Sequence, residues 1–134
     1  GQIDGVALLL FVIVALWTAG FDVIYACQDE EFDRKEGLYS IPARFGLRRA
    51  LLLSRWFHAG TVLGLLFFWL LTPLGGWFFV GVLAAAAILI YEHRIVSPDD
   101  MSRLNTAFFT MNGVLSVVVF LFAMVDVMVD VIWG

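Results

Sequence analysis

The chain has 134 residues, of which 62% are hydrophobic, and its mean hydropathy is +0.94. This composition excludes an ordinary soluble domain, in which about half of the residues are apolar. The single cysteine excludes an internal disulfide, and the net charge of −4 is uninformative until its distribution is considered. We therefore expect one membrane domain over residues 1–134, with the lipid bilayer as its surroundings and no nucleic-acid partner.

Four apolar stretches are each near the ~20 residues that a membrane-spanning helix needs. They cover residues 5–27, 50–71, 76–91 and 105–125, and the third is the shortest. The runs are continuous rather than alternating, which favours helices over the strands of a membrane barrel. The first run lacks the basic start and the cleavage site of a signal peptide. We predict an all-α membrane protein with four transmembrane helices.

The basic residues are confined to two of the connections between these stretches. All eight Lys and Arg flank either the first connection or the third, and they are Arg34, Lys35, Arg44, Arg48, Arg49, Arg55, Arg94 and Arg103. With four spans, these two connections lie on the same side of the membrane. The positive-inside rule predicts that this side is cytoplasmic and that both termini face outward.

The first connection carries clear helix stop and start signals. We expect the first helix to continue past the membrane to about Lys35 and to stop at Gly37. Ser40 is placed to cap a short helix that Gly46 would end. In the third connection, residues 97–100 have the Ser-Pro-Asp-Asp pattern of a helix start.

The strongest chemical signal is a set of three aspartates at the end of the first span. Asp22, Asp29 and Asp33 are spaced i, i+7 and i+11, so on an α-helix they fall within roughly 40° of one another. Asp22 lies inside the apolar run, where an unpaired carboxylate costs ~2.5–3.5 kcal/mol. A cation is the economical partner, and oxygen ligands with bound phosphate favour Mg²⁺. The alternative for the last two is a solvated acidic helix end.

Four further residues are candidates for substrate contact. Tyr25 lies near the aspartate face, Lys35 could reach a diphosphate or extend to lipid headgroups, and Arg44 is a weaker diphosphate candidate. Asn112 shares a face with Asn105 in the last span, where amides either join helices or contact a polar ring substituent.

The remaining ionisable residues are expected to be structural. His58 and His93 show no metal-ligand pattern, and we place them in the core or at the interface. Glu92 is expected to form an interfacial charge pair with Arg94. Two acids beyond the last span are expected to face outward and be solvated, namely Asp126 and Asp130.

Long strings of the sequence resemble a known family. The run D-V-I-Y-A-C-Q-D-E-E-F-D-R-K-E-G is similar to the second aspartate-rich motif of the UbiA superfamily of intramembrane prenyltransferases. The strings G-L-Y-S-I-P-A-R-F-G and Y-E-H-R-I-V-S-P-D-D-M-S-R-L-N-T-A-F-F-T-M-N-G resemble its branch of 4-hydroxybenzoate polyprenyltransferases and relatives in menaquinone synthesis. D-x-x-x-D alone is a weak signal, whereas the combined string is specific and covers nearly all of the chain.

This resemblance implies a fold and a reaction. The four spans would be the last four of a nine-helix bundle in a bacterial inner membrane. The reaction would be Mg²⁺-dependent transfer of a polyprenyl group from a prenyl diphosphate to 4-hydroxybenzoate or a dihydroxynaphthoate, in ubiquinone or menaquinone biosynthesis. Asp29 and Asp33 would bind Mg²⁺ and the diphosphate, with support from Asp22, and Lys35 would contact the diphosphate.

The family also has a first aspartate-rich motif, N-x-x-x-D-x-x-x-D, and these residues do not contain it. The resemblance therefore implies a missing N-terminal half, and we expect the chain alone to be inactive. Two alternatives stay open: transfer to another acceptor, and a non-enzymatic membrane protein with an acidic cation site.

Overall fold

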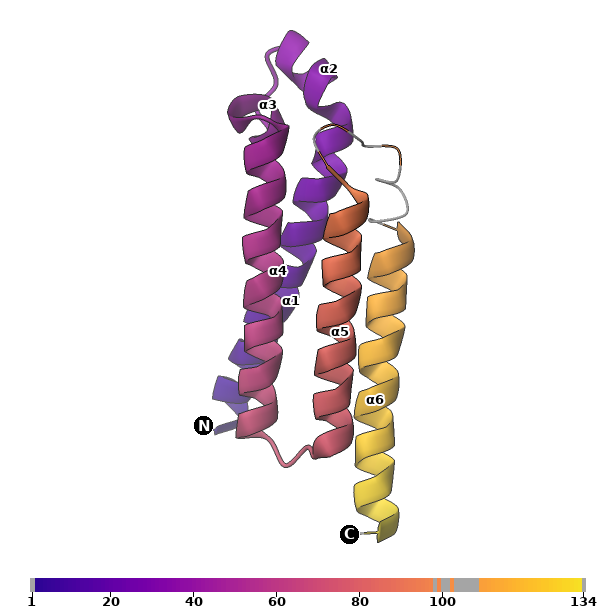
Figure 1. The fold of residues 1–134 in the computed structure, drawn as a ribbon. Coiled ribbons are helices and arrows are strands. Elements are labelled where there is room, and N and C mark those ends of the chain that lie inside the picture. The colour runs from indigo at the N-terminus through magenta and orange to yellow at the C-terminus, as the bar shows by residue number, and fades with distance from the viewer. Residues whose placement is uncertain (1, 98, 100–101, 103–108, 134) are drawn as a thin grey trace.

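The computed structural model of the chain describes residues 2–97, 99, 102 and 109–133. Its four long helices are α1 (Gln2–Ala26), α4 (Leu47–Leu71), α5 (Gly76–Ile95) and α6 (Met111–Trp133) (Figure 1). Within the described residues there are four helices that are long and apolar enough to cross a membrane, and no strand is present. The prediction of an all-α membrane protein with four spans is confirmed.

The ends of two spans differ from the prediction. α5 continues to Ile95, about one turn beyond the expected end, and α6 continues to Trp133 instead of ending at residue 125. The apolar run thus underestimates the length of α6, because its helix continues through two acidic residues. Asn105 lies outside the described residues, and the helix start expected at residues 97–100 lies partly outside them.

The first connection folds as its sequence signals predict. It contains a 3-10 turn η1 (Cys27–Asp29) and two short helices, α2 (Glu30–Lys35) and α3 (Ile41–Phe45). Gly37, just beyond α2, has a φ of +71°, and Gly46, just beyond α3, has a φ of +91°. The Ser40 hydroxyl accepts a hydrogen bond of 3.2 Å from the Ala43 amide and so caps α3. The predicted helix end near Lys35, the capping role of Ser40 and the helix-ending role of Gly46 are all confirmed.

The connection through α2 and α3 lies at the same end of the molecule as the C-terminal end of α5 and the N-terminal end of α6 (Figure 1). The turn between α4 and α5 and both ends of the chain lie at the opposite end. The helix ends that flank the two basic connections are therefore together, as the charge pattern requires. Which membrane side they face stays a prediction.

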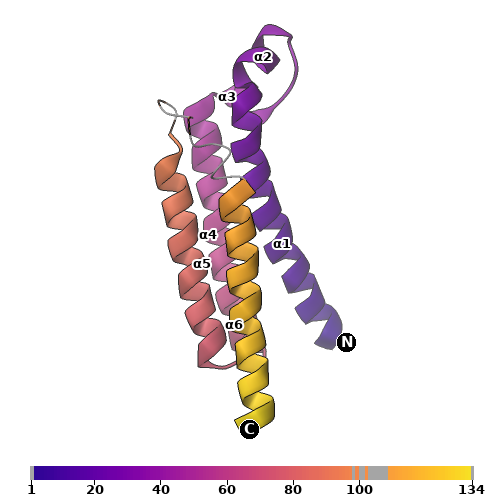
Figure 2. The same cartoon turned by 90° about the vertical axis from the view of Figure 1, so that its right-hand side faces the viewer.

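The most extensive packing joins α1 to α4, followed by α5 to α6, and α4 packs less extensively against α5. The main core lies among these helices and is built from the side chains of Ile13, Phe21, Leu65, Phe78, Val82, Ala85, Leu89 and Leu115. α1 diverges from α6 toward the N-terminus (Figure 2). Large apolar side chains stay exposed along the spans, Phe11, Leu70 and Ile132 among them, as lipid-facing positions do.

One acid has a structural role that the sequence analysis did not assign. Asp126 on α6 is only 6% exposed, and its carboxylate accepts hydrogen bonds from the backbone amides of Gly75 at 2.8 Å and Phe78 at 2.7 Å. These amides belong to the N-terminal end of α5, where unpaired N–H groups and the helix dipole favour an anion. The expectation that Asp126 is solvated is wrong, whereas Asp130 is exposed as expected.

Candidate functional site

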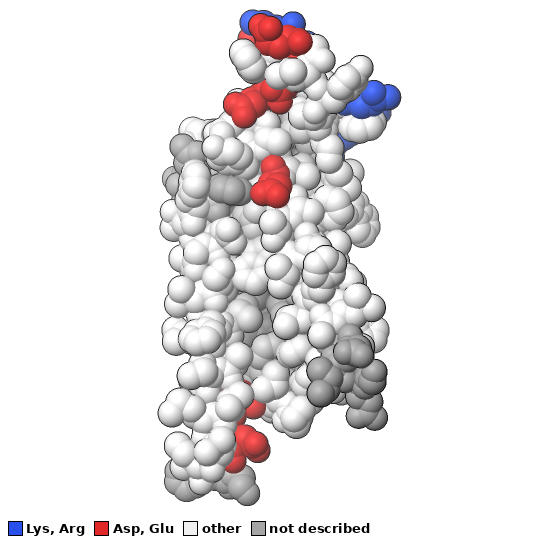
Figure 3. All heavy atoms as spheres, turned by 180° about the vertical axis from the view of Figure 1, so that it is seen from behind, with Lys and Arg blue, Asp and Glu red and all other residues white. Residues whose placement is uncertain are grey.

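The three aspartates lie where α1 passes through η1 into α2. Acidic side chains gather at this end of one face of the molecule (Figure 3). The expectation of an unbroken α-helix is wrong, because residues 27–29 form a 3-10 turn. At ~120° per residue, this turn widens the expected spread of Asp22, Asp29 and Asp33 from roughly 40° to about 80°. They would still occupy one side of the helix, but their joint action stays a prediction.

The neighbouring cations on α2 contact glutamates of the same helix. Arg34 Nη1 lies 3.4 Å from Glu30 Oε1, and Lys35 Nζ lies 3.0 Å from Glu31 Oε1. Both pairs have i, i+4 spacing. Lys35 and Glu31 are both more than two-thirds exposed, so this pair contributes little and opens at low cost. A diphosphate contact by Lys35 requires that opening.

The aspartates of the D-x-x-x-D pair stay available for a cation. Asp29 is exposed and Asp33 is half-buried, and within the described residues neither forms an ion pair. Their carboxylates supply the hard oxygen donors that Mg²⁺ prefers. The pair does not belong to any convergent group of three metal-ligating side chains in the described residues. Mg²⁺ does not need one, because it is usually held by one or two carboxylates plus substrate phosphates.

A groove of about 390 Å³ brings two other candidates together. It lies between α1 and α6, and its lining consists of Val14, Trp17, Thr18, Phe21, Asp22, Asn112 and Ser116. The indole N–H of Trp17 donates a 3.0 Å hydrogen bond to the side-chain oxygen of Asn112. This bond bears out the helix-joining role of Asn112. Asp22 faces this groove, beside polar groups, rather than an entirely apolar surface.

Tyr25 and Arg44 lie outside the lining of this groove. Tyr25 is 37% exposed, and its ring meets the Phe109 ring edge-on with 5.9 Å between the ring centres. Arg44 is exposed on α3, with its guanidinium 5.7 Å from the centre of the Phe45 ring. A substrate role for either residue stays a prediction.

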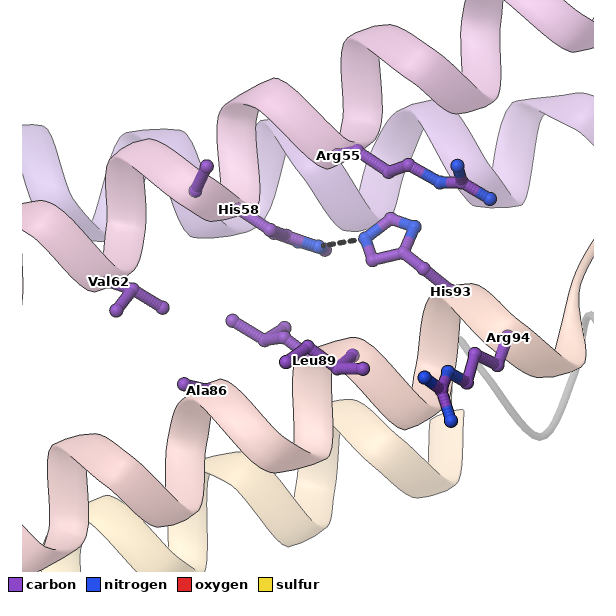
Figure 4. A pocket seen from close by; sticks show the side chains of 9 residues that line it. Arg55, His58, Val62, Ala86, Leu89, His93 and Arg94 are labelled. Atoms are coloured by element: carbon purple, nitrogen blue, oxygen red, sulfur yellow. Dashed lines mark hydrogen bonds between the residues drawn. The ribbon is translucent and has the colours of Figure 1, made fainter.

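His58 is buried in the core, as expected, but its proximity to His93 and Glu92 was not predicted. His58 on α4 and His93 on α5 point toward each other across the space between their helices (Figure 4), and their Nδ1 and Nε2 atoms are 2.8 Å apart. Glu92 is fully buried beside them. Its Oε1 lies 3.4 Å from His58 Nδ1 and 3.3 Å from His93 Nε2.

The expected interfacial pair of Glu92 with Arg94 is therefore wrong. Arg94 is exposed, and no ion pair joins it to Glu92 in the part of the chain that the structure describes. The sequence did carry one signal for the cluster. Ionisable residues inside an apolar span are costly, and they face the interior in most membrane proteins.

Known proteins resemble this chain over most of its length. A family model described as "UbiA prenyltransferase family" matches residues 1–124. A 4-hydroxybenzoate octaprenyltransferase of Aeromonas salmonicida is 34% identical over 107 residues, which are 80% of this chain and 37% of that protein. Proteins of the same name from Pseudomonas fluorescens and Chromohalobacter salexigens are 33% and 32% identical, over 81% and 80% of this chain and 36% of each relative.

The chain thus spans a little over a third of the length of these curated relatives. No solved structure matches it. The family model covers more than nine-tenths of the residues, from the first span into the last. On this evidence the chain belongs to the UbiA prenyltransferase family.

Proposed function

We propose that the whole protein containing these residues transfers a polyprenyl group from a prenyl diphosphate to 4-hydroxybenzoate. Family membership and the names of the three relatives support prenyl transfer to this acceptor. The observation that carries the proposal is the availability of Asp29 and Asp33, neither of which forms an ion pair within the described residues. Both lie beside the end of α1, whose Asp22 lines a groove.

Asp29 and Asp33 would hold Mg²⁺ in this proposal, and Asp22 would add negative charge nearby. Mg²⁺, when bound, would neutralise the charge that develops on the leaving diphosphate. Lys35, once released from Glu31, would add a further positive group at that diphosphate. Arg44 is a second cationic candidate for the same role.

The chemistry asks the protein for positioning and for exclusion of water. The carbon–oxygen bond to the diphosphate breaks, and the allylic carbon forms a bond to the ring carbon ortho to the hydroxyl, which then loses its proton. The apolar surfaces of the spans would hold the isoprenoid tail and exclude water from the allylic cation. Asn112 and Tyr25 would contact polar substituents of the ring in this proposal. We assign no protein nucleophile to the reaction.

The proposal also includes an orientation. We place α2 and α3 on the cytoplasmic side of the bacterial inner membrane, because these two helices and the adjoining ends of α4 and α5, which carry the described basic residues, lie at that end (Figure 1). Carboxylates for the other half of the site would come from an N-x-x-x-D-x-x-x-D segment outside these residues. The chain described here is then insufficient for transfer.

The test is a transfer assay on the whole protein in native membranes. A polyprenyl diphosphate is supplied with either 4-hydroxybenzoate or dihydroxynaphthoate, with Mg²⁺ or with EDTA, and the prenylated product is identified by mass spectrometry. We expect prenylated 4-hydroxybenzoate, lost with EDTA and restored by added Mg²⁺. Product from the naphthoate alone would contradict the acceptor, and no product from either would contradict the function.

A further inference from the structure

A second polar cluster lies inside the bundle, on helices other than the one that carries the aspartates. His58 on α4 is 2% exposed, Glu92 on α5 is fully buried, and the His93 side chain on α5 is 11% exposed. One potential ligand atom of each lies within 4.8 Å of the others, and within the described residues no other such group of three exists. Ionisable side chains within a span mark a functional site by default.

Glu92 is the member that most needs a partner. Neither of its two side-chain oxygens has a hydrogen-bond partner in the described residues, although both are buried. The two histidine nitrogens near Oε1 lie at 3.3 and 3.4 Å, without the alignment of a hydrogen bond. A buried carboxylate without partners is strongly unfavourable, and a bound cation would remove that cost.

The His58 ring is held in the orientation that a metal ligand needs. Its Nε2 lies 3.2 Å from the carbonyl oxygen of Trp17, which can only accept a hydrogen bond. Nε2 therefore carries the proton, and Nδ1 keeps its lone pair toward His93 and Glu92. Metal-bound histidines typically donate their other ring N–H to a backbone carbonyl or a carboxylate in this way.

The backbone of α1 makes room for this ring. A Cβ atom at Gly20 would lie 2.4 Å from His58 Nε2, so a glycine is needed where the imidazole crosses α1. The Ser54 hydroxyl, one turn before His58, donates a 2.8 Å hydrogen bond to the Gly20 carbonyl and fixes α4 against α1. The histidine is thus positioned by two independent contacts with a neighbouring helix.

His58 Nδ1, His93 Nε2 and Glu92 Oε1 face one another at separations that suit a metal site. The two nitrogens are 2.8 Å apart, and the Glu92 oxygen lies 3.3 Å from His93 Nε2 and 3.4 Å from His58 Nδ1. A triangle with these sides has a circumradius of about 1.8 Å, so an ion about 1 Å above its plane would lie about 2.1 Å from each atom. The angles at that ion would be about 85–110°, close to the angles of an octahedral face and of a tetrahedron.

We propose that His58, Glu92 and His93 bind one divalent first-row transition ion, Zn²⁺ or Fe²⁺. Two imidazoles and one carboxylate are the donor set of such ions, whereas Mg²⁺ prefers oxygen ligands alone. The ion joins α4 to α5. Both histidines also line a cavity of about 420 Å³ between these helices, with walls that include Val62 and Leu89, so a water or a small ligand can complete the coordination.

The experiment measures metal in the whole protein, purified in detergent without chelator. Elemental analysis should find about one equivalent of Zn or Fe, which a large excess of Mg²⁺ does not displace. After chelation, titration with Co²⁺ should give the visible absorption of imidazole coordination. Glu92→Gln should weaken Zn²⁺ binding at least tenfold, as even loss of an outer partner can. Asp126→Asn, which alters a buried carboxylate elsewhere in the fold, is the matched control and should keep the ion.

Two results would overturn the proposal. One is wild-type protein with neither a stoichiometric transition ion nor a Co²⁺ absorption band, which would leave a hydrogen-bonded cluster without metal. This measurement decides the question even where Glu92→Gln fails to fold. The other is a folded Glu92→Gln variant that binds Zn²⁺ as tightly as the wild type.

Discussion

Asp126 provides a test of how α5 and α6 are held together. Its carboxylate accepts two short hydrogen bonds from the N-terminal end of α5, from Gly75 and Phe78, and it is nearly buried. Asp126→Asn keeps the shape of the side chain. It replaces one acceptor oxygen by an NH₂ group. That group would face a backbone N–H, from which it cannot accept a hydrogen bond.

The expected cost follows from these contacts. The variant loses one hydrogen bond to a charged acceptor, worth about 1.5–3 kcal/mol. It also loses a negative charge at the positive end of the α5 dipole, worth about 0.3–1 kcal/mol. We therefore expect Asp126→Asn to lower the free energy of unfolding by about 2–4 kcal/mol.

The assay is equilibrium unfolding of the purified whole protein in mixed micelles with increasing sodium dodecyl sulfate, followed by circular dichroism. Asp130→Asn, one turn further along α6 at an exposed position, is the control and should change stability by less than about 0.5 kcal/mol. If both variants lose the same small amount, Asp126 does not cap α5 and the reasoning is refuted.

Three smaller perturbations test other contacts. Gly20→Ala would place a methyl group 2.4 Å from His58 Nε2, so the ring must move, and the same unfolding assay should show a loss of about 1–3 kcal/mol. Ser40→Ala removes the cap of α3 and should cost about 0.5–2 kcal/mol locally, seen as faster amide hydrogen exchange in that helix. Trp17→Phe removes the 3.0 Å bond to Asn112 and should lower stability by about 1 kcal/mol, and unchanged stability would show that the bond is dispensable.

The parts of the fold that depend on local signals were predictable. Gly37 and Gly46 adopt the positive φ that glycine permits, and Ser40 caps the helix that follows it. The continuous apolar runs predicted four spans, because a bilayer imposes nearly the same length on each helix. These features need only neighbouring residues, so a single sequence contains their cause.

The parts of the fold that depend on distant partners were not predictable from the sequence. Asp126 reads as a solvated acid because the amides that it binds are 48 and 51 residues away. His58 and His93 are 35 residues apart, and only the packing of α4 against α5 brings them together. The 3-10 turn at residues 27–29 also changes the angular spread of the three aspartates from that of an unbroken α-helix. Residue spacing predicts which side chains share a helix face only within one regular helix, and not across a turn with a different number of residues per turn.

The most direct test of the proposed function compares neighbouring acids of one helix. In the whole protein, Asp29→Asn and Asp33→Asn remove the charges proposed to hold Mg²⁺, whereas Glu30→Gln removes a charge that lies 3.4 Å from Arg34. Mg²⁺-dependent transfer to 4-hydroxybenzoate is measured in membranes that contain equal amounts of each protein. We predict that both aspartate variants lose transfer and that Glu30→Gln retains it. Transfer that survives in both aspartate variants, or a loss in Glu30→Gln as large as theirs, would contradict the assignment of the magnesium site.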